Sequence, residues 1–161
     1  MENNRFNLKH YFKLNKTIHI SMAVGMILFA GVLMFIYHSK GARIVDDKLK
    51  QILLVLSAIL TISSILAGNF ITKKKLQHLN LAGSLMEKLT AYRTILIIGW
   101  ALLEGPALFS MVVFQLSGDF LFIGIAGFLV LYFFTLYPSK YKAISDLNLG
   151  LEEKRIIERN S

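Results

Sequence analysis

Long apolar runs separated by short polar connectors dominate the chain. Four of these runs are long enough to cross a hydrocarbon core, which takes about 20 residues of α-helix. They extend roughly from Thr17 to Tyr37, Gln51 to Ile71, Thr94 to Leu116 and Phe120 to Tyr137. The first run exceeds the apolar region of about 7 to 15 residues of a signal peptide and has no small-residue cleavage site, so we expect it to be retained. The pattern therefore predicts four membrane-spanning helices.

The amino-acid composition also favours a membrane protein. Of the 161 residues, 55% are hydrophobic and 17% are charged, and the mean hydropathy is +0.55. A soluble domain of this size with such a balance would expose extensive apolar surface to water. The absence of cysteine excludes disulfides and thiolate metal sites. The predicted fold class is an all-α membrane protein, a bundle of four transmembrane helices.

Basic residues gather on one side of the four predicted spans. They occupy the amino-terminal segment, the connector after the second span and the tail after the fourth, and include Arg5, Lys9, Lys13, Lys16, Lys73, Lys74, Lys75, Lys88, Arg93, Lys140, Lys142, Lys154, Arg155 and Arg159. On the other side Lys40, Arg43, Lys48 and Lys50 are partly offset by Asp46 and Asp47. Because basic loops stay in the cytoplasm, both termini are predicted to be cytoplasmic. Attraction to anionic headgroups explains the net charge of +8, so no nucleic-acid partner is expected.

Polar residues and proline mark the ends of the predicted helices. Ser84 and Glu87 match an S-x-x-E capping box, so the third helix is predicted to begin at Ser84. Pro138 and Ser139 end the fourth run. The chain is thus divided into a transmembrane domain, 1–137, and a polar helical tail, 138–161. The tail is expected either to lie on headgroups or a partner, or to be partly frayed.

One carboxylate, Glu104, falls near the middle of the third span. A charged residue at that depth costs about 2.5 to 3.5 kcal/mol on insertion scales, so it should face protein or a water-filled cavity. Ser57, Thr61 and Ser64 stack on one side of the second helix at a similar depth. We expect Glu104 to hydrogen-bond one of these three hydroxyls.

Small residues predict how the second and third helices meet. Ser64 and Gly68 form one small-xxx-small pair, and Ala101 and Gly105 form another. Pro106 directly follows, and it is expected to kink the helix and free the carbonyl of Leu102. A free carbonyl beside a carboxyl is the start of a proton or cation site. The competing interpretation is a neutral acid hydrogen-bonded within a helix that is kinked for packing.

No motif of a soluble enzyme is present, and the connectors are too short to fold a catalytic domain. We therefore predict no catalytic residues, no cofactor and no metal. His19 and Asn69 lie near span ends and are expected to reach interfacial water.

Two segments carry a family resemblance. The runs AYRTILIIGWALLEGPALFS and LYPSKYKAISDLNL resemble a family of small four-span bacterial inner-membrane proteins of unknown function. The resemblance implies a multi-pass protein of the bacterial inner membrane, but no activity. The mid-membrane carboxylate is also faintly similar to that of rotary ATPase proteolipid subunits. The second helix lacks their glycine repeat and the connector 72–91 is longer than theirs, so no function is carried over.

Two classes of function stay open at this level. One is a non-enzymatic accessory or structural subunit of a membrane complex, which binds lipid headgroups and either further copies of itself or a larger assembly. The other is a small transport or ion-coupling component that uses Glu104. A water-accessible cavity around Glu104 would favour the second class, and dry packing against Thr61 would favour the first.

Overall fold

The computed structural model describes residues 8–41, 45–79 and 83–160, which form helices and short connections without any strand in those ranges. The helices are α1 (Leu8–Lys40), α2 (Asp47–Gln77), α3 (Leu85–Ser117), α4 (Phe120–Thr135), α5 (Lys140–Asp146) and α6 (Leu151–Asn160). Arg5 and Arg43, used above to predict orientation, lie outside the described residues.

Three helices, α1, α2 and α3, are long and apolar enough to cross a membrane. The fourth predicted span is shorter than expected, because α4 ends at Thr135 and α5 turns away from it by 80°. A helix of 16 residues is about 24 Å long, which is less than a hydrocarbon core of about 30 Å. Three apolar helices, or four if the bent pair is one span, are typical of a multi-pass membrane protein.

Polar caps determine where the helices begin. The predicted capping box of α3 is confirmed: the Glu87 amide donates to Ser84 Oγ at 3.4 Å, and the Ser84 amide donates to Glu87 Oε2 at 2.9 Å. Asp46 caps α2, and Asp119 caps α4. Gly118 ends α3 in the left-handed conformation, with φ 69°, which suits a residue without a side chain.

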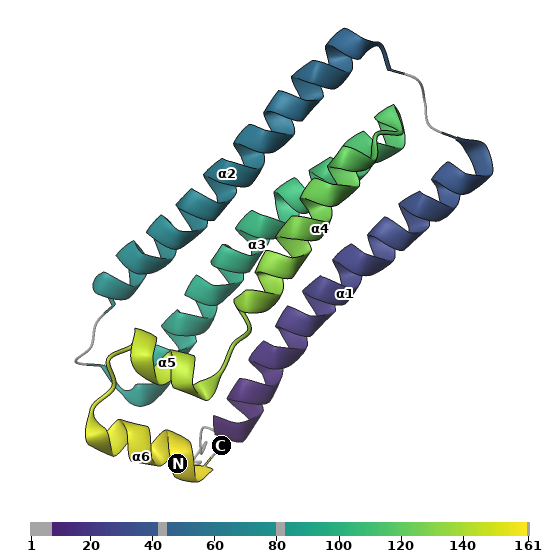
Figure 1. Cartoon of the computed structure of the whole chain (residues 1–161). Coiled ribbons are helices and arrows are strands. Elements are labelled where there is room, and N and C mark those ends of the chain that lie inside the picture. The colour runs from purple at the N-terminus through teal and green to yellow at the C-terminus, as the bar shows by residue number, and fades with distance from the viewer. Residues whose placement is uncertain (1–7, 42–44, 80–82, 161) are drawn as a thin grey trace.

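Helix α3 is the centre of the bundle and buries more side chains than any other helix. It packs against α1, α2 and α4, and Figure 1 shows α3 and α4 running between the flanking α1 and α2. Trp100, Tyr92 and Phe114 on α3 and Phe133 on α4 are among the largest fully buried side chains. Helix α3 contributes to both apolar clusters of the bundle: Tyr92 and Trp100 to the larger one, and Phe114 to a smaller one with Phe122 of α4.

Helices α5 and α6 form a folded cap, 140–160, over the end of the bundle where α1 and α3 begin (Figure 1). Ala143, Leu147 and Ile157 of the cap are buried, and they belong to the same apolar cluster as Leu8 and Tyr11 of α1. The predicted tail thus packs on the chain's own helices, and whether its outer side lies on headgroups or a partner stays a prediction. Burial explains Leu147 and Ile157, while Leu151 and Ile156 remain exposed.

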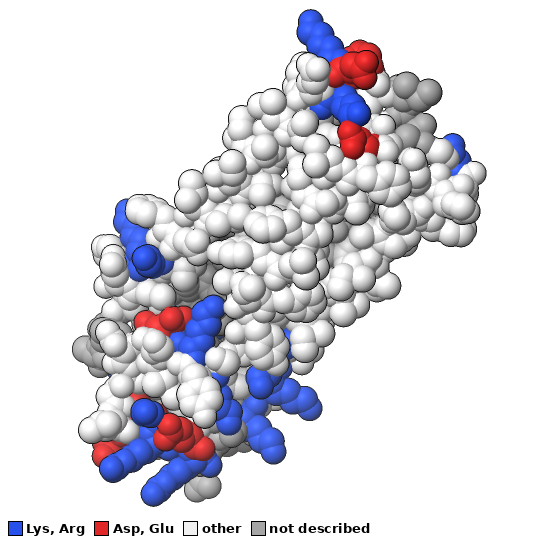
Figure 2. All heavy atoms as spheres, in the orientation of Figure 1, with Lys and Arg blue, Asp and Glu red and all other residues white. Residues whose placement is uncertain are grey.

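On the face seen in Figure 2, charged side chains lie at the two ends of the molecule and leave a broad uncharged band between them. Lysines and arginines gather mostly at the cap end, and a smaller mixed group lies at the opposite end. There, Lys50 Nζ lies 2.7 Å from Asp119 Oδ2 and connects α2 to the turn between α3 and α4. The uncharged band has the surface expected of a segment within lipid.

Candidate functional site

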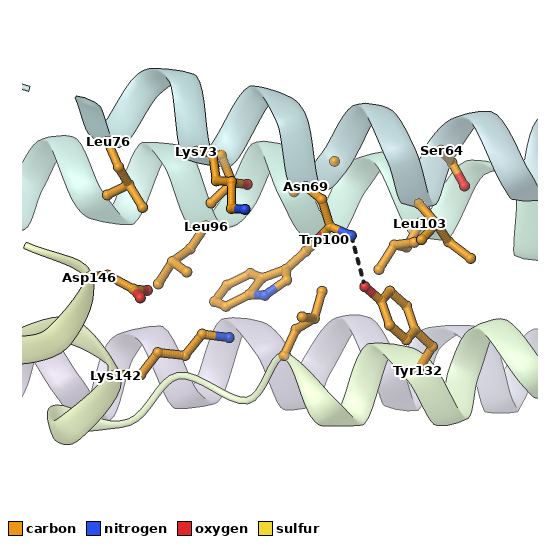
Figure 3. A pocket seen from close by; sticks show the side chains of 15 residues that line it. Ser64, Asn69, Lys73, Leu76, Leu96, Trp100, Leu103, Tyr132, Lys142 and Asp146 are labelled. Carbon is orange, nitrogen blue, oxygen red and sulfur yellow. Dashed lines mark hydrogen bonds between the residues drawn. The ribbon is translucent and has the colours of Figure 1, made fainter. Parts of the chain in front are cut away.

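A polar pocket of about 440 Å³ lies between α2, α3, α4 and α5, next to the cap. Its volume falls within the range of about 300 to 1,000 Å³ that is common for ligand pockets. Figure 3 shows its side chains converging from all four helices. The polar and aromatic ones are Ser64, Asn69, Thr72, Lys73, Trp100, Tyr132, Lys142 and Asp146.

The short fourth helix creates this pocket. Since α4 stops at Thr135 while α2 continues to Gln77, the last turns of α2 have no helix of equal length opposite them. The 80° turn at Pro138 and Ser139 then places Lys142 and Asp146 of α5 in the lining. Gly99 fits at the inner wall, because a Cβ at this position would lie 3.4 Å from Thr72 Oγ1.

Hydrogen bonds fix part of the lining. Asn69 Nδ2 donates to the Tyr132 hydroxyl at 3.4 Å and connects α2 to α4 (Figure 3). Asp146 Oδ2 accepts a hydrogen bond of 2.7 Å from the Tyr92 hydroxyl, which connects α5 to α3. These two bonds hold opposite walls of the pocket.

Behind Trp100, His19 is packed among aromatic rings. Its ring stacks on Phe133 at 4.3 Å and meets Trp100 edge-on at 4.9 Å between centroids. Nε2 lies 3.1 Å from the Phe133 carbonyl oxygen, which can only accept, so Nε2 carries the proton. His19 is 0% exposed, so the expectation that it reaches interfacial water is wrong. The surrounding rings account for this, since Phe133 stacks on the imidazole while Trp100 and Tyr137 meet it edge-on.

The hydroxyl face predicted on α2 is present. Ser57, Thr61 and Ser64 are the buried residues of this helix. Their expected hydrogen bonds to Glu104 are absent: Ser64 Oγ donates to the Thr61 carbonyl at 2.9 Å, and the Ser57 and Thr61 hydroxyls have no hydrogen-bond partner within the described ranges. Of the three, only Ser64 lines the polar pocket.

Glu104 lies on a different side of α3. Trp100 contacts His19 of α1, and Arg93 Nε donates to Asn15 Oδ1 of α1 at 2.9 Å. Positions four and eleven residues apart share a helix face, so Glu104 also lies toward α1. Gly99, which faces Thr72 of α2, is five positions before Glu104 and so points to nearly the opposite side. The half-buried Glu104 side chain makes no hydrogen bond or ion pair with any residue that the structure describes.

The predicted small-residue contact between α2 and α3 is also displaced. Ala101 and Gly105 are exposed, and a Cβ at Gly105 would meet nothing within 4 Å. The two helices do pack extensively, but Gly99 rather than Gly105 supplies the close approach. Pro106 lies within α3, which continues as one helix to Ser117. Neither Glu104 nor Pro106 lines the polar pocket.

Sequence reasoning passed over most of the pocket residues. Lys142 and Asp146 were assigned to the tail, and Asn69 and Trp100 were given no site role. One signal was available: Lys142 and Asp146 are four residues apart and share a face of any helix that follows Pro138. The fold-back of α5 that brings this face to Trp100 depends on contacts distant in sequence.

The chain matches no protein-family model, no curated protein and no solved structure. Among the described residues, no group of three or more His, Asp and Glu side chains is arranged to hold a metal ion. The candidate site is therefore identified by its geometry alone, as a polar pocket beside a basic cap.

Proposed function

We propose that the chain is a multi-pass protein of the bacterial inner membrane, with four transmembrane helices and both termini in the cytoplasm. It acts without catalysis, as an accessory or structural subunit of a membrane complex. The concentration of lysine and arginine at the cap end supports this orientation (Figure 2). The resemblance of the two segments quoted above to small inner-membrane proteins is a further reason for the assigned membrane.

The observation that carries the proposal is the outer surface of the cap. Tyr141 on α5 is 80% exposed, and Leu151 on α6 is 76% exposed. Both helices are held to the bundle by buried residues, so these two side chains are presented on a folded surface rather than on a loose tail. In the proposed contact these two side chains form the apolar part, and charged neighbours such as Lys154 and Arg155 form its polar rim.

The ion-coupling alternative requires Glu104 to reach water inside the bundle. Glu104 lines neither the polar pocket nor the apolar cavity that α1, α3 and α4 enclose around Met111 and Ala126. The hydrogen bonds expected between the α2 hydroxyls and Glu104 are absent. The geometry therefore favours the accessory subunit.

Purification in mild detergent tests the proposal. The wild-type chain should elute with a partner, either another copy or another protein, at a fixed stoichiometry. The double variant Tyr141→Ala, Leu151→Ala should elute as a single chain of 18.2 kDa with unchanged helical content. Leu121→Ala removes an apolar side chain that is 52% exposed from the opposite end and should keep the complex. A wild-type monomer, or a complex that survives the double substitution, contradicts the proposal.

A further inference from the structure

The pocket contains a hydrogen-bond donor, the Trp100 indole N–H, that has no acceptor among the described residues. Trp100 is 1% exposed, lines the pocket and lies between the side chains of Lys73 and Lys142 in Figure 3. Its indole N–H makes no hydrogen bond with any residue in the described ranges. A buried tryptophan usually finds an acceptor, and an indole N–H can only donate. Among the described residues no acceptor is supplied, so the indole N–H is open to an acceptor that enters the pocket.

Two cations flank this donor. Lys73 on α2 and Lys142 on α5 both line the pocket, and no described carboxylate lies within ion-pair distance of either ammonium. The one carboxylate in the lining, Asp146, already accepts from Tyr92. The lining therefore carries a net positive charge, and its free donors match an anion with several oxygens.

The rest of the lining is apolar. Ile65 and Leu103 continue the pocket away from the cap, toward the uncharged band of the bundle, and Leu136 adds an apolar side chain where α4 ends. The exposed Asn69 and Lys73 show that the pocket reaches the protein surface beside α2. One end of the site thus suits an anion and the other suits hydrocarbon, which is the chemistry of an amphiphile at the edge of a bilayer.

We propose that this pocket binds the phosphate of an anionic phospholipid, with the phosphate oxygens at Lys73, Lys142 and the Trp100 N–H. The acyl chains extend along the apolar wall between α2 and α4. Basic pockets between membrane helices are suited to anionic headgroups on the cytoplasmic side. The site does not depend on the partner proposed for the outer surface of the cap, because it opens beside α2 and its lining includes neither Tyr141 nor Leu151.

The single tryptophan of the chain supplies the measurement, since Trp100 fluorescence reports on the pocket directly. Purified protein in neutral detergent is titrated with phosphatidylglycerol or phosphatidylcholine whose acyl chains carry bromine, which quenches indole emission on close approach. The wild type should reach half-quenching at about tenfold lower phosphatidylglycerol than phosphatidylcholine. Native mass spectrometry should show one retained phosphatidylglycerol per chain.

Matched variants test whether the preference for phosphatidylglycerol over phosphatidylcholine arises in the pocket. Lys73→Gln with Lys142→Gln should abolish the difference between the two lipids, while Lys75→Gln with Lys154→Gln removes the same charge from the same end outside the pocket and should keep it. Equal quenching of the wild type by both lipids overturns the proposal without any variant, and so does a preference that survives in the pocket variant. Reversal of the quenching by millimolar inorganic phosphate would instead identify a site for soluble phosphate and overturn the assignment to lipid.

Discussion

The Tyr92 hydroxyl donates a hydrogen bond of 2.7 Å to the Asp146 carboxylate across 54 residues of sequence. This contact fastens α5 to α3 and holds one wall of the polar pocket. Leu147, the residue after Asp146, is 2% exposed, so the hydrogen bond and the apolar contact of the cap act at the same place. The cap is consequently part of the folded bundle.

Removing the hydroxyl should loosen the cap. Tyr92→Phe keeps the buried ring but leaves Asp146 without its donor, so the free energy of unfolding should fall by about 1 to 2 kcal/mol. Thermal unfolding in detergent measures the change. Tyr141→Phe is the control, because that ring is 80% exposed and no such bond is lost. Equal stability of wild type and Tyr92→Phe would mean that the contact contributes nothing.

The ion pair between Lys88 and Glu153 should hold α6 against the bundle. Lys88 Nζ lies 2.7 Å from Glu153 Oε1, and the Lys88 side chain is only 9% exposed. Glu153→Gln leaves this ammonium without a countercharge, so unfolding should be easier by about 1 to 3 kcal/mol. Proteolysis of the segment before α6 should become faster.

Glu152→Gln is the matched control for that experiment. Glu152 pairs with Arg155 at 3.5 Å, but the two side chains are 85% and 67% exposed, and such surface pairs contribute little. Cleavage that is equally fast in both glutamine variants would argue against a specific role for the pair with Lys88.

Acid should weaken the end of the molecule opposite the cap. The Lys50 ammonium and the Leu121 amide both donate to Asp119, which holds the pKa of this carboxyl below its ordinary value of 3.8. A carboxylate with a lowered pKa in the folded state stabilises the protein above that ordinary value, and the stabilisation is lost as pH falls through the lowered pKa. The melting temperature of the wild type should therefore drop on acidification by more than that of Asp119→Asn.

Asparagine is a suitable replacement in this test because it can still cap α4. The comparison then isolates the charge of Asp119 from its capping role. Parallel melting curves of the two proteins down to pH 3 would show that the pair with Lys50 is not coupled to folding.

Neutralising Glu104 should be harmless. Its carboxyl has no hydrogen-bond or ion-pair partner among the described residues, so Glu104→Gln should change the free energy of unfolding by less than about 1 kcal/mol. The variant should also form the same detergent complex as the wild type. If the wild type carries a proton or ion flux in reconstituted vesicles and Glu104→Gln does not, the result would support the ion-coupling function instead.

The sequence predicted what depends on local chemistry. Apolar runs located the long helices, and the serine and glutamate of the capping box predicted a helix start at Ser84, which is the N-cap of α3 directly before Leu85. The burial of Ser57, Thr61 and Ser64 also followed from their helical spacing. These features need no knowledge of which helix faces which.

The partners across the bundle could not be predicted in the same way. A small-residue pair is a pattern that any close helix contact can use, and both Gly99 and Gly105 were available on α3. Packing of Trp100 on His19 turns the Glu104 side of α3 toward α1 and leaves Gly99 for α2. The docking of the cap likewise depends on contacts such as that of Lys88 with Glu153, which are 65 residues apart.

Both the partner surface and the lipid pocket require the cap to lie in the cytoplasm. The chain has no native cysteine, so single cysteines can be introduced at Gln77, at Ser117 and at Glu158 of the cap and labelled with a membrane-impermeant maleimide. In intact cells only the cysteine at Ser117 should react, and those at Gln77 and Glu158 should react after permeabilisation. Reaction of Gln77 and Ser117 from the same side, or of Glu158 in intact cells, would contradict the four-span protein with a cytoplasmic cap.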